Sequence, residues 1–159
     1  MRKGGSMNFE VLPGIGIGPV KLGMNRAEVI EALGENNHSD SSDTSENFYK
    51  YSFQVEFTNE IVSFIGVSQD PSYQLTYKDK NVFDVEANDL FDLISNDESK
   101  KHDYTESEYV FPDQIISLWD ADEQYDRLGG EQRKIWAQIG MGSQVYLSDI
   151  IRITNKGSG

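Results

Sequence analysis

The stretch "YKYSFQVEFTNEIVSFIGVS", which runs from Tyr49 to Ser68, decides the predicted fold. The apolar side chains of its first part recur at every second position: Tyr49, Tyr51, Phe53, Val55 and Phe57. Such alternation predicts an antiparallel strand with one buried face, because successive side chains point to opposite sides of a sheet. The segment "TNE" then turns the chain, and "IVSFIGVS" is predicted to be the second strand of a hairpin.

A short helix is predicted before this hairpin, within "LGMNRAEVIEALG" (Leu22 to Gly34). Asn25 is placed to cap it, and Glu28 three residues later completes a capping box. Gly34 follows the last apolar residue, where a glycine commonly ends a helix. The polar stretch "ENNHSDSSDTSEN" between the helix and the hairpin is predicted to be a loop, because Ser, Asp and Asn pack poorly.

Glycines alternate in "GIGIG" (Gly14 to Gly18), which raises the question of a phosphate-binding loop. Such a loop leads directly into a helix whose N-terminus meets the anion. Here "PVKL" separates Gly18 from the helix cap, and the spacing fits neither common glycine motif. The glycines are therefore predicted to mark a bent edge strand or a turn.

The same order of elements recurs in the second half of the chain. "LGMNRAEVIEALG" aligns without a gap on "FDVEANDLFDLIS" (Phe83 to Ser95), so that apolar positions fall on apolar positions. The two hairpin strands correspond to "YVFPDQIISLW" and to "IWAQIGMG", with an acidic insertion at 120–134 between them. This pattern predicts a duplication.

The predicted fold class is therefore α+β, with two repeated helix-plus-antiparallel-sheet units. Residues 1–6 are set aside as a tag or disordered start, 7–72 form the first repeat and 73–159 the second, together making one compact unit. The sequence leaves open whether the sheets join into one continuous curved sheet with the helices on one face.

Composition narrows the function. The chain has 27 acidic and 14 basic residues, a net charge of −13, and no cysteine. Nucleic acid and anionic membranes are poor partners for such a chain, because both bind basic surfaces. A basic protein is the expected partner, a cytoplasmic location is expected, and no run of about 20 apolar residues is present to span a bilayer.

The first unit resembles a recurrent bacterial module. The residues that carry the likeness are Leu22, Gly23, Met24, Val29, Leu33 and Gly34. The module is that of small outer-membrane assembly lipoproteins and of beta-lactamase-inhibitor-like domains, and the tandem arrangement is similar to the latter. The second unit resembles uncharacterised proteins of the toxin-immunity type. The chain lacks the lipoprotein's lipid-bearing cysteine and the inhibitors' disulfides, so the resemblance implies a fold and protein binding, and no catalytic residue.

No catalytic or metal-binding set is recognised. The two histidines, His38 and His102, lie in polar acidic stretches and are interpreted as solvated loop residues. The chain is accordingly expected not to be an enzyme and to need no cofactor or metal.

The acidic insertion is the predicted partner-binding site, because aromatic residues there stand among carboxylates that can pair with Arg or Lys. Its residues are Trp119, Asp120, Asp122, Glu123, Tyr125 and Asp126. The favoured function is that of an immunity protein that neutralises a basic toxin domain, such as a nuclease. The alternative is a small-molecule-binding or regulatory module of unknown ligand. The sequence does not distinguish a monomer from a dimer.

Overall fold

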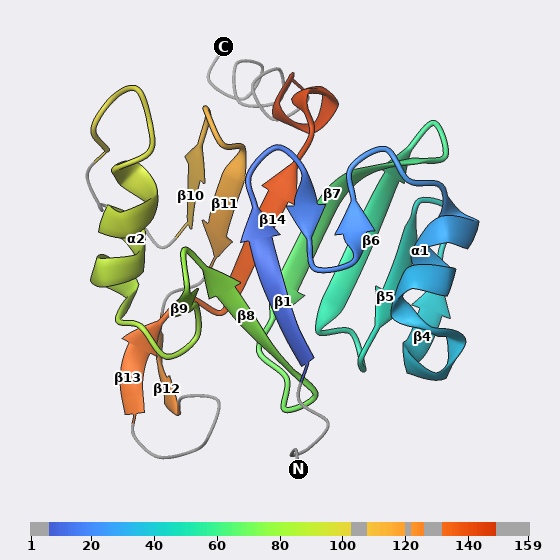
Figure 1. The fold of residues 1–159 in the computed structure, drawn as a ribbon, viewed down its shortest axis with the longest axis horizontal. Helices are drawn as coiled ribbons and strands as arrows, with labels where there is room; N and C mark the ends of the chain where they lie inside the picture. The colour runs from blue at the N-terminus through green and yellow to red at the C-terminus, as the bar shows by residue number, and fades with distance from the viewer. Residues whose placement is uncertain (1–6, 103–107, 120–121, 126–131, 149–159) are drawn as a thin grey trace.

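Two β-sheets stacked on one another form the body of the protein (Figure 1). The structure, a computed structural model, describes residues 7–102, 108–119, 122–125 and 132–148. The larger sheet has seven antiparallel strands. In spatial order these are β10 (Glu108–Phe111), β11 (Ile116–Trp119), β14 (Gln138–Gly142), β7 (Ile61–Ser68), β6 (Phe53–Thr58), β5 (Ser45–Phe48) and β4 (His38–Ser41).

The smaller sheet lies in front of the larger one in Figure 1. Its strands, in spatial order, are β3 (Val20–Lys21), β2 (Gly16–Ile17), β1 (Met7–Leu12), β8 (Tyr73–Tyr77) and β9 (Lys80–Asn81). The pairing of β1 with β8 is parallel, whereas the other strand pairings of the smaller sheet are antiparallel. A separate hairpin joins β11 to β14 and consists of β12 (Asp122–Tyr125) and β13 (Gln132–Ile135).

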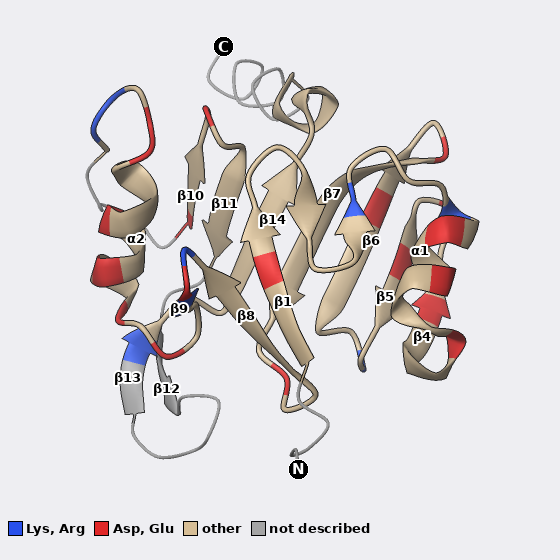
Figure 2. Ribbon diagram, viewed as in Figure 1, with Lys and Arg blue, Asp and Glu red and all other residues tan. Residues whose placement is uncertain are grey.

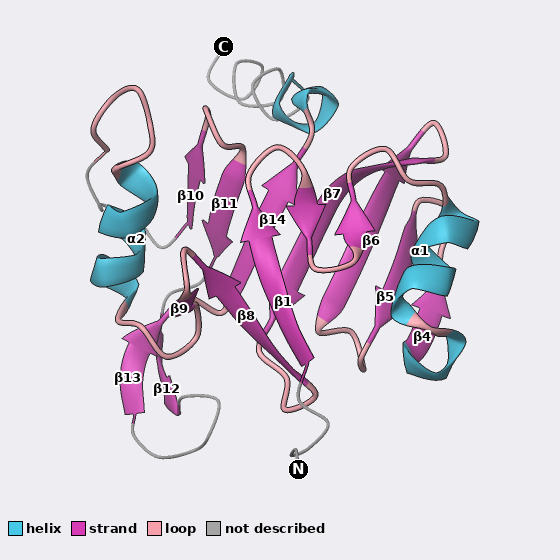
Figure 3. Ribbon diagram, viewed as in Figure 1, coloured by secondary structure: helices cyan, strands magenta, loops and turns pink. Residues whose placement is uncertain are grey.

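Two short helices flank the smaller sheet on the same side of the larger one (Figure 3). Helix α1 (Arg26–Leu33) has the predicted capping box between Asn25 and Glu28, and Gly34 with φ 92° is its C-cap. The 3₁₀ turn η1 (Glu35–Asn37) follows it. Helix α2 (Ala87–Ser95) buries Leu90, Phe91 and Ile94, and packs against β10 through Phe91 and Phe111. A helical turn at 144–148 follows β14.

The core lies between the two sheets and beneath the helices. Phe9 of β1 stacks on Tyr73 of β8 at 5.1 Å between ring centroids, and meets Phe53 of β6 edge-on at 5.6 Å. Under α2, Trp136 is fully buried and its Nε1 donates a hydrogen bond to the Ala87 carbonyl over 3.1 Å. One continuous core therefore includes residues from both halves of the chain.

The predicted α+β fold of two helix-plus-sheet repeats is wrong. The protein is mostly β, with a stacked pair of sheets and helices of only 8 and 9 residues. The halves divided at residues 72 and 73 are not separate units, because β1 pairs with β8 and β7 pairs with β14. The two halves have similar local sequence patterns around their helices. Those patterns do not specify which strands pair across the halves.

Local predictions had mixed outcomes. The strand predicted from Tyr49 begins only at Phe53, because Tyr49, Lys50 and Tyr51 all have positive φ and form a turn. The polar stretch predicted to be a loop instead forms η1, β4 and β5. The glycines do mark turns as predicted: Gly14 and Gly18 have positive φ, and a side chain at Gly16 would collide with the Val20 carbonyl.

Replacing Phe53 tests the orientation of β6. Phe53 is fully buried, whereas its neighbour Gln54 points to the other face of the sheet. We expect Phe53→Ala to lower the free energy of unfolding by about 3–5 kcal/mol, because it leaves a cavity between the sheets. Gln54→Ala, the matched control, should change it by less than about 0.5 kcal/mol. Chemical denaturation measures both, and similar losses for the two variants would contradict the assigned orientation.

Candidate binding surface

The outer face of the larger sheet is turned away from the smaller sheet and the helices. Because directly paired residues point to the same side, the register identifies what this face carries. From β6 to β10, this face carries the following residues, strand by strand: Glu56, Phe64 and Gly66, Gly140 and Gly142, Ser117 and Trp119, and Glu108. Glu56 and Glu108 are exposed. Among the described side chains, the outer face therefore presents exposed carboxylates on β6 and on β10.

The seven strands of the larger sheet contain no Lys or Arg. Figure 2 shows the same distribution, with acidic positions on β6 and β5 and no basic position on β14 or β7. No described strand of this sheet can therefore neutralise the carboxylates of the outer face with a cation of its own.

Aromatic rings lie flat on the outer face because three glycines leave room for them. The ring of Phe64 covers Gly140, where any side chain would collide with it, and lies close to Gly66, where a side chain would be tightly confined. Tyr146, from the turn at 144–148, lies over Gly142 and stacks on Phe64 with ring centroids 4.6 Å apart. Burial raises the pKa of the Tyr146 hydroxyl, so this tyrosine is neutral at ordinary pH.

Trp119 is the predicted site residue that the structure places on this face. It ends β11, is half-buried, and donates from Nε1 to the Ser117 hydroxyl over 3.0 Å. Asp122, Glu123 and Tyr125 lie on β12, and their side chains are outside the described part of the chain. Asp120 and Asp126 also lie outside the described residues. The insertion is thus a hairpin following Trp119, and the outer-face residues Glu56, Phe64, Glu108 and Tyr146 were not predicted.

A cleft of about 590 Å³ opens at the end of the sheets where β14 finishes. Apolar side chains of Leu22, Ile61, Val62 and Val145 line it, together with the polar side chains of Ser63 and Gln114. Ile115 in its wall has φ 54°, a conformation that is rare for a β-branched residue. The volume falls in the range of about 300–1,000 Å³ that is typical of small-molecule sites.

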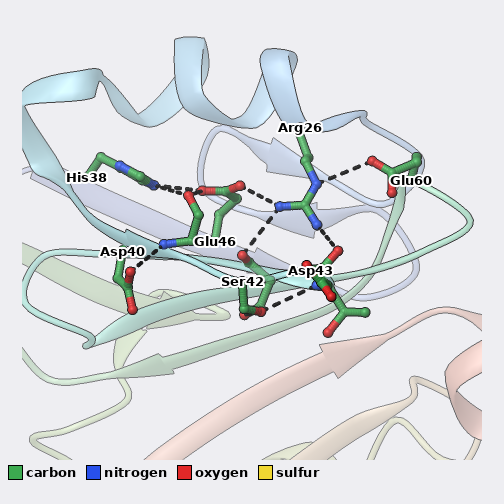
Figure 4. Close-up of polar contacts among 10 residues, drawn as sticks. Arg26, His38, Asp40, Ser42, Asp43, Glu46 and Glu60 are labelled. Atoms are coloured by element: carbon green, nitrogen blue, oxygen red, sulfur yellow. Dashed lines mark hydrogen bonds and ion pairs between the residues drawn. The ribbon is translucent and has the colours of Figure 1, made fainter.

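A buried carboxylate holds helix α1 against the larger sheet (Figure 4). Glu46 on β5 is 3% exposed and accepts hydrogen bonds from Arg26 Nη1 at 2.5 Å and from Ser41 Oγ. His38 Nε2 lies 2.6 Å from the same carboxylate. Burial by itself would raise the pKa of Glu46, but the hydrogen bonds from Ser41, His38 and Arg26 outweigh it and lower the pKa. Glu46 is therefore ionised at neutral pH.

Arg26 joins several elements. Its guanidinium also donates to the Asp43 carbonyl, pairs with Glu60 at 3.3 Å, and lies 4.9 Å from the centre of the Phe57 ring. These contacts connect the start of α1 to the β4–β5 turn and the β6–β7 turn. The cluster is accordingly a structural tie.

The grouping of Ser41, His38 and Glu46 lacks the geometry of a catalytic triad. In a triad the base uses one ring nitrogen for the nucleophile and the other for the acid. Here Ser41 Oγ, at 3.1 Å, and Glu46 both approach Nε2 of His38, and Ser41 donates directly to Glu46. The arrangement satisfies a buried carboxylate and leaves Ser41 without a separate base.

The second histidine is also engaged in structure. His102 Nδ1 lies 2.6 Å from the Tyr109 hydroxyl, and its Nε2 lies 3.6 Å from the buried side chain of Glu98. Glu98 in turn accepts hydrogen bonds from the backbone of Asp113 and Gln114. The interpretation of both histidines as solvated loop residues is therefore wrong.

Removing the charge of Glu46 tests the tie. We expect Glu46→Gln to lower the free energy of unfolding at pH 7 by about 1.5–3 kcal/mol, the range for hydrogen bonds to charged groups. Because the folded-state pKa of Glu46 is lowered, its contribution is present above the unfolded pKa of about 4.3 and is lost as the pH falls through the folded value. The difference between wild type and variant should therefore shrink in acid.

Denaturation curves from pH 7 to pH 3 measure this difference. Glu60→Gln is the matched control, because the Glu60 side chain is 75% exposed and its ion pair with Arg26 contributes little. Equal stability of Glu46→Gln and wild type at pH 7 would contradict the structural role.

Within the described residues no group of acidic and histidine side chains is arranged to hold a metal ion, and no helix is long and apolar enough to cross a membrane. Comparisons with protein families, with curated proteins and with solved structures find no match to this chain. The support for a function of the outer face is therefore limited to the residues that the face carries.

Proposed function

We propose that the protein binds another protein of basic charge through the outer face of its larger sheet. The observation that carries the proposal is the composition of that face: exposed Glu56 and Glu108, half-buried Trp119 and Tyr146, and strands without Lys or Arg. Aromatic side chains supply much of the binding energy of protein interfaces. Carboxylates around them favour a cationic partner.

The overall charge supports the same partner. A net charge of −13 produces a long-range field that attracts a cationic surface and raises the rate of encounter. The acidic insertion, with Asp120, Asp122, Glu123, Tyr125 and Asp126, directly follows Trp119 in the chain and is proposed as a second contact region.

The biological role that we propose is that of an immunity protein that binds and neutralises a basic toxin domain in the cytoplasm. The role needs no catalytic group in this chain, only a surface complementary to the toxin. The support for this role is the resemblance of the sequence to immunity-type and inhibitor-like modules. The role itself stays a prediction.

A salt series tests binding by the outer face. The protein is mixed with the candidate basic toxin domain encoded beside its gene, and association rates are measured by stopped-flow fluorescence. We expect association to slow severalfold between low and physiological salt, where the Debye length falls to about 8 Å. Replacing Glu56 and Glu108 by Gln should slow association at low salt. A control that replaces Glu31 and Glu35 removes the same charge from α1 and η1 and should have a smaller effect.

A further variant separates the two contact regions. Neutralising Asp120, Asp122, Glu123 and Asp126 should also slow association if the insertion is in contact with the partner. A tight complex whose rates ignore salt and all these variants would contradict the proposal.

The cleft beside Ile61 and Val145 favours a second candidate function, a small-molecule-binding or regulatory module. Its volume of about 590 Å³ and its apolar wall with Ser63 and Gln114 suit a small, mostly apolar ligand. Screening a fragment library by ligand-observed NMR tests this candidate. Hits that are lost in Val145→Trp, which narrows the cleft at an exposed wall residue, but kept in Glu108→Gln would favour it over protein binding.

A further inference from the structure

We propose that the outer face holds two binding sites for arginine side chains, each made of an aromatic ring beside a carboxylate. The inference rests on the proposed function and specifies which cation of the partner is recognised. The sites are Trp119 with Glu108, and Tyr146 with Glu56.

The first pair is fixed by strand register. Glu108 of β10 lies directly opposite Trp119 of β11, so their side chains emerge side by side on the outer face. The indole is held along its own strand by the hydrogen bond from its Nε1 to Ser117. Glu108 is exposed, Trp119 is half-buried, and no described contact occupies the Glu108 carboxylate. The indole ring of Trp119 and the carboxylate of Glu108 are thus available to the same cation.

The second pair depends on β6 and β7. Glu56 lies directly opposite Phe64, and Tyr146 stacks on Phe64 with ring centroids 4.6 Å apart. Glu56 and Tyr146 thus both adjoin Phe64, one through strand register and the other through ring stacking. The half-buried Tyr146 is the accessible ring of the pair.

Arginine fits these sites better than lysine does. The guanidinium group is planar, stacks on an aromatic face, and can donate two parallel hydrogen bonds to a carboxylate at the same time. The ammonium group of lysine is compact and strongly hydrated, so it gains less from the ring. A carboxylate without an adjacent ring would show no such preference.

The spacing of the pairs sets a geometric requirement on the partner. Trp119 of β11 pairs with a residue of β14 that itself pairs with Ser68 of β7, so Trp119 is level with Ser68 two strands away. Ser68 is four residues from Phe64 along β7. At about 4.8 Å between strands and about 3.3 Å per residue, Trp119 lies roughly 16 Å from Phe64, the residue on which Tyr146 stacks. A partner that fills both sites must therefore present two arginines at about this distance.

Hexa-arginine and hexa-lysine peptides test the inference, because they carry equal charge. Isothermal titration at low salt should give an affinity for hexa-arginine about fourfold or more above that for hexa-lysine, from about two- to fivefold at each site. Trp119→Leu and Tyr146→Leu should each reduce this ratio while leaving the affinity for hexa-lysine nearly unchanged. Tyr51→Leu, which removes an exposed tyrosine elsewhere, should leave the ratio unchanged.

Glu108→Gln keeps the ring and covers the case in which an aromatic variant fails to fold. It should weaken binding of both peptides while hexa-arginine stays favoured. Equal affinities of the wild type for the two peptides, or a ratio unaffected by both aromatic variants, would overturn the arginine sites but leave binding of cations intact. If neither peptide binds at low salt, the proposed function fails together with the inference.

Discussion

The pairing of β7 with β14 is the interaction on which the larger sheet depends. Strands β4 to β7 form one antiparallel block and β10, β11 and β14 form another. Among the strands that the structure describes, only this pairing joins the two blocks. Without it each block would expose a strand edge with unsatisfied backbone groups. The register places Gly66 opposite Gly140, so the ring of Phe64 can lie across the joint. The outer face therefore continues without interruption from one half of the chain to the other.

The parts of the fold that local physics determines could be predicted from the sequence. The capping box of α1 needs only Asn25 and Glu28, and the inward row of β6 follows from the alternation of Phe53, Val55 and Phe57. The same reasoning placed Tyr49 and Tyr51 in the strand. It failed there because the backbone of both residues has positive φ, which no periodicity of side chains reveals.

Contacts between distant segments account for what could not be predicted. β4 and β5 have a loop-like composition, yet Glu46 becomes buried there because Arg26 arrives from α1 and His38 from the neighbouring strand. The parallel pair of β1 with β8 unites segments more than sixty residues apart, and no local pattern announces it. The duplicated pattern of helix and strands predicted one sheet for each half of the chain, whereas each sheet contains strands from both halves.

The candidate site could be predicted only in part for the same reason. Trp119 stood out because an aromatic residue precedes an acidic run. Its neighbour Glu108 is on another strand, and Phe64, Glu56 and Tyr146 come from elements scattered along the chain. A sequence can point to a residue type that suits binding, but the sheet register decides which carboxylate stands beside which ring.

The alternation of the strands separates two kinds of constraint in this protein. Inward residues such as Val55, Ile65 and Ile139 are fully buried between the sheets, whereas the outward residues Glu56 and Glu108 are exposed. Exposed outward positions such as Glu56 and Glu108 can therefore change with little effect on stability, whereas Gly140 and Gly142 must stay small beneath the rings of Phe64 and Tyr146. Single substitutions at these exposed positions can thus alter the chemistry of the outer face while the protein stays folded.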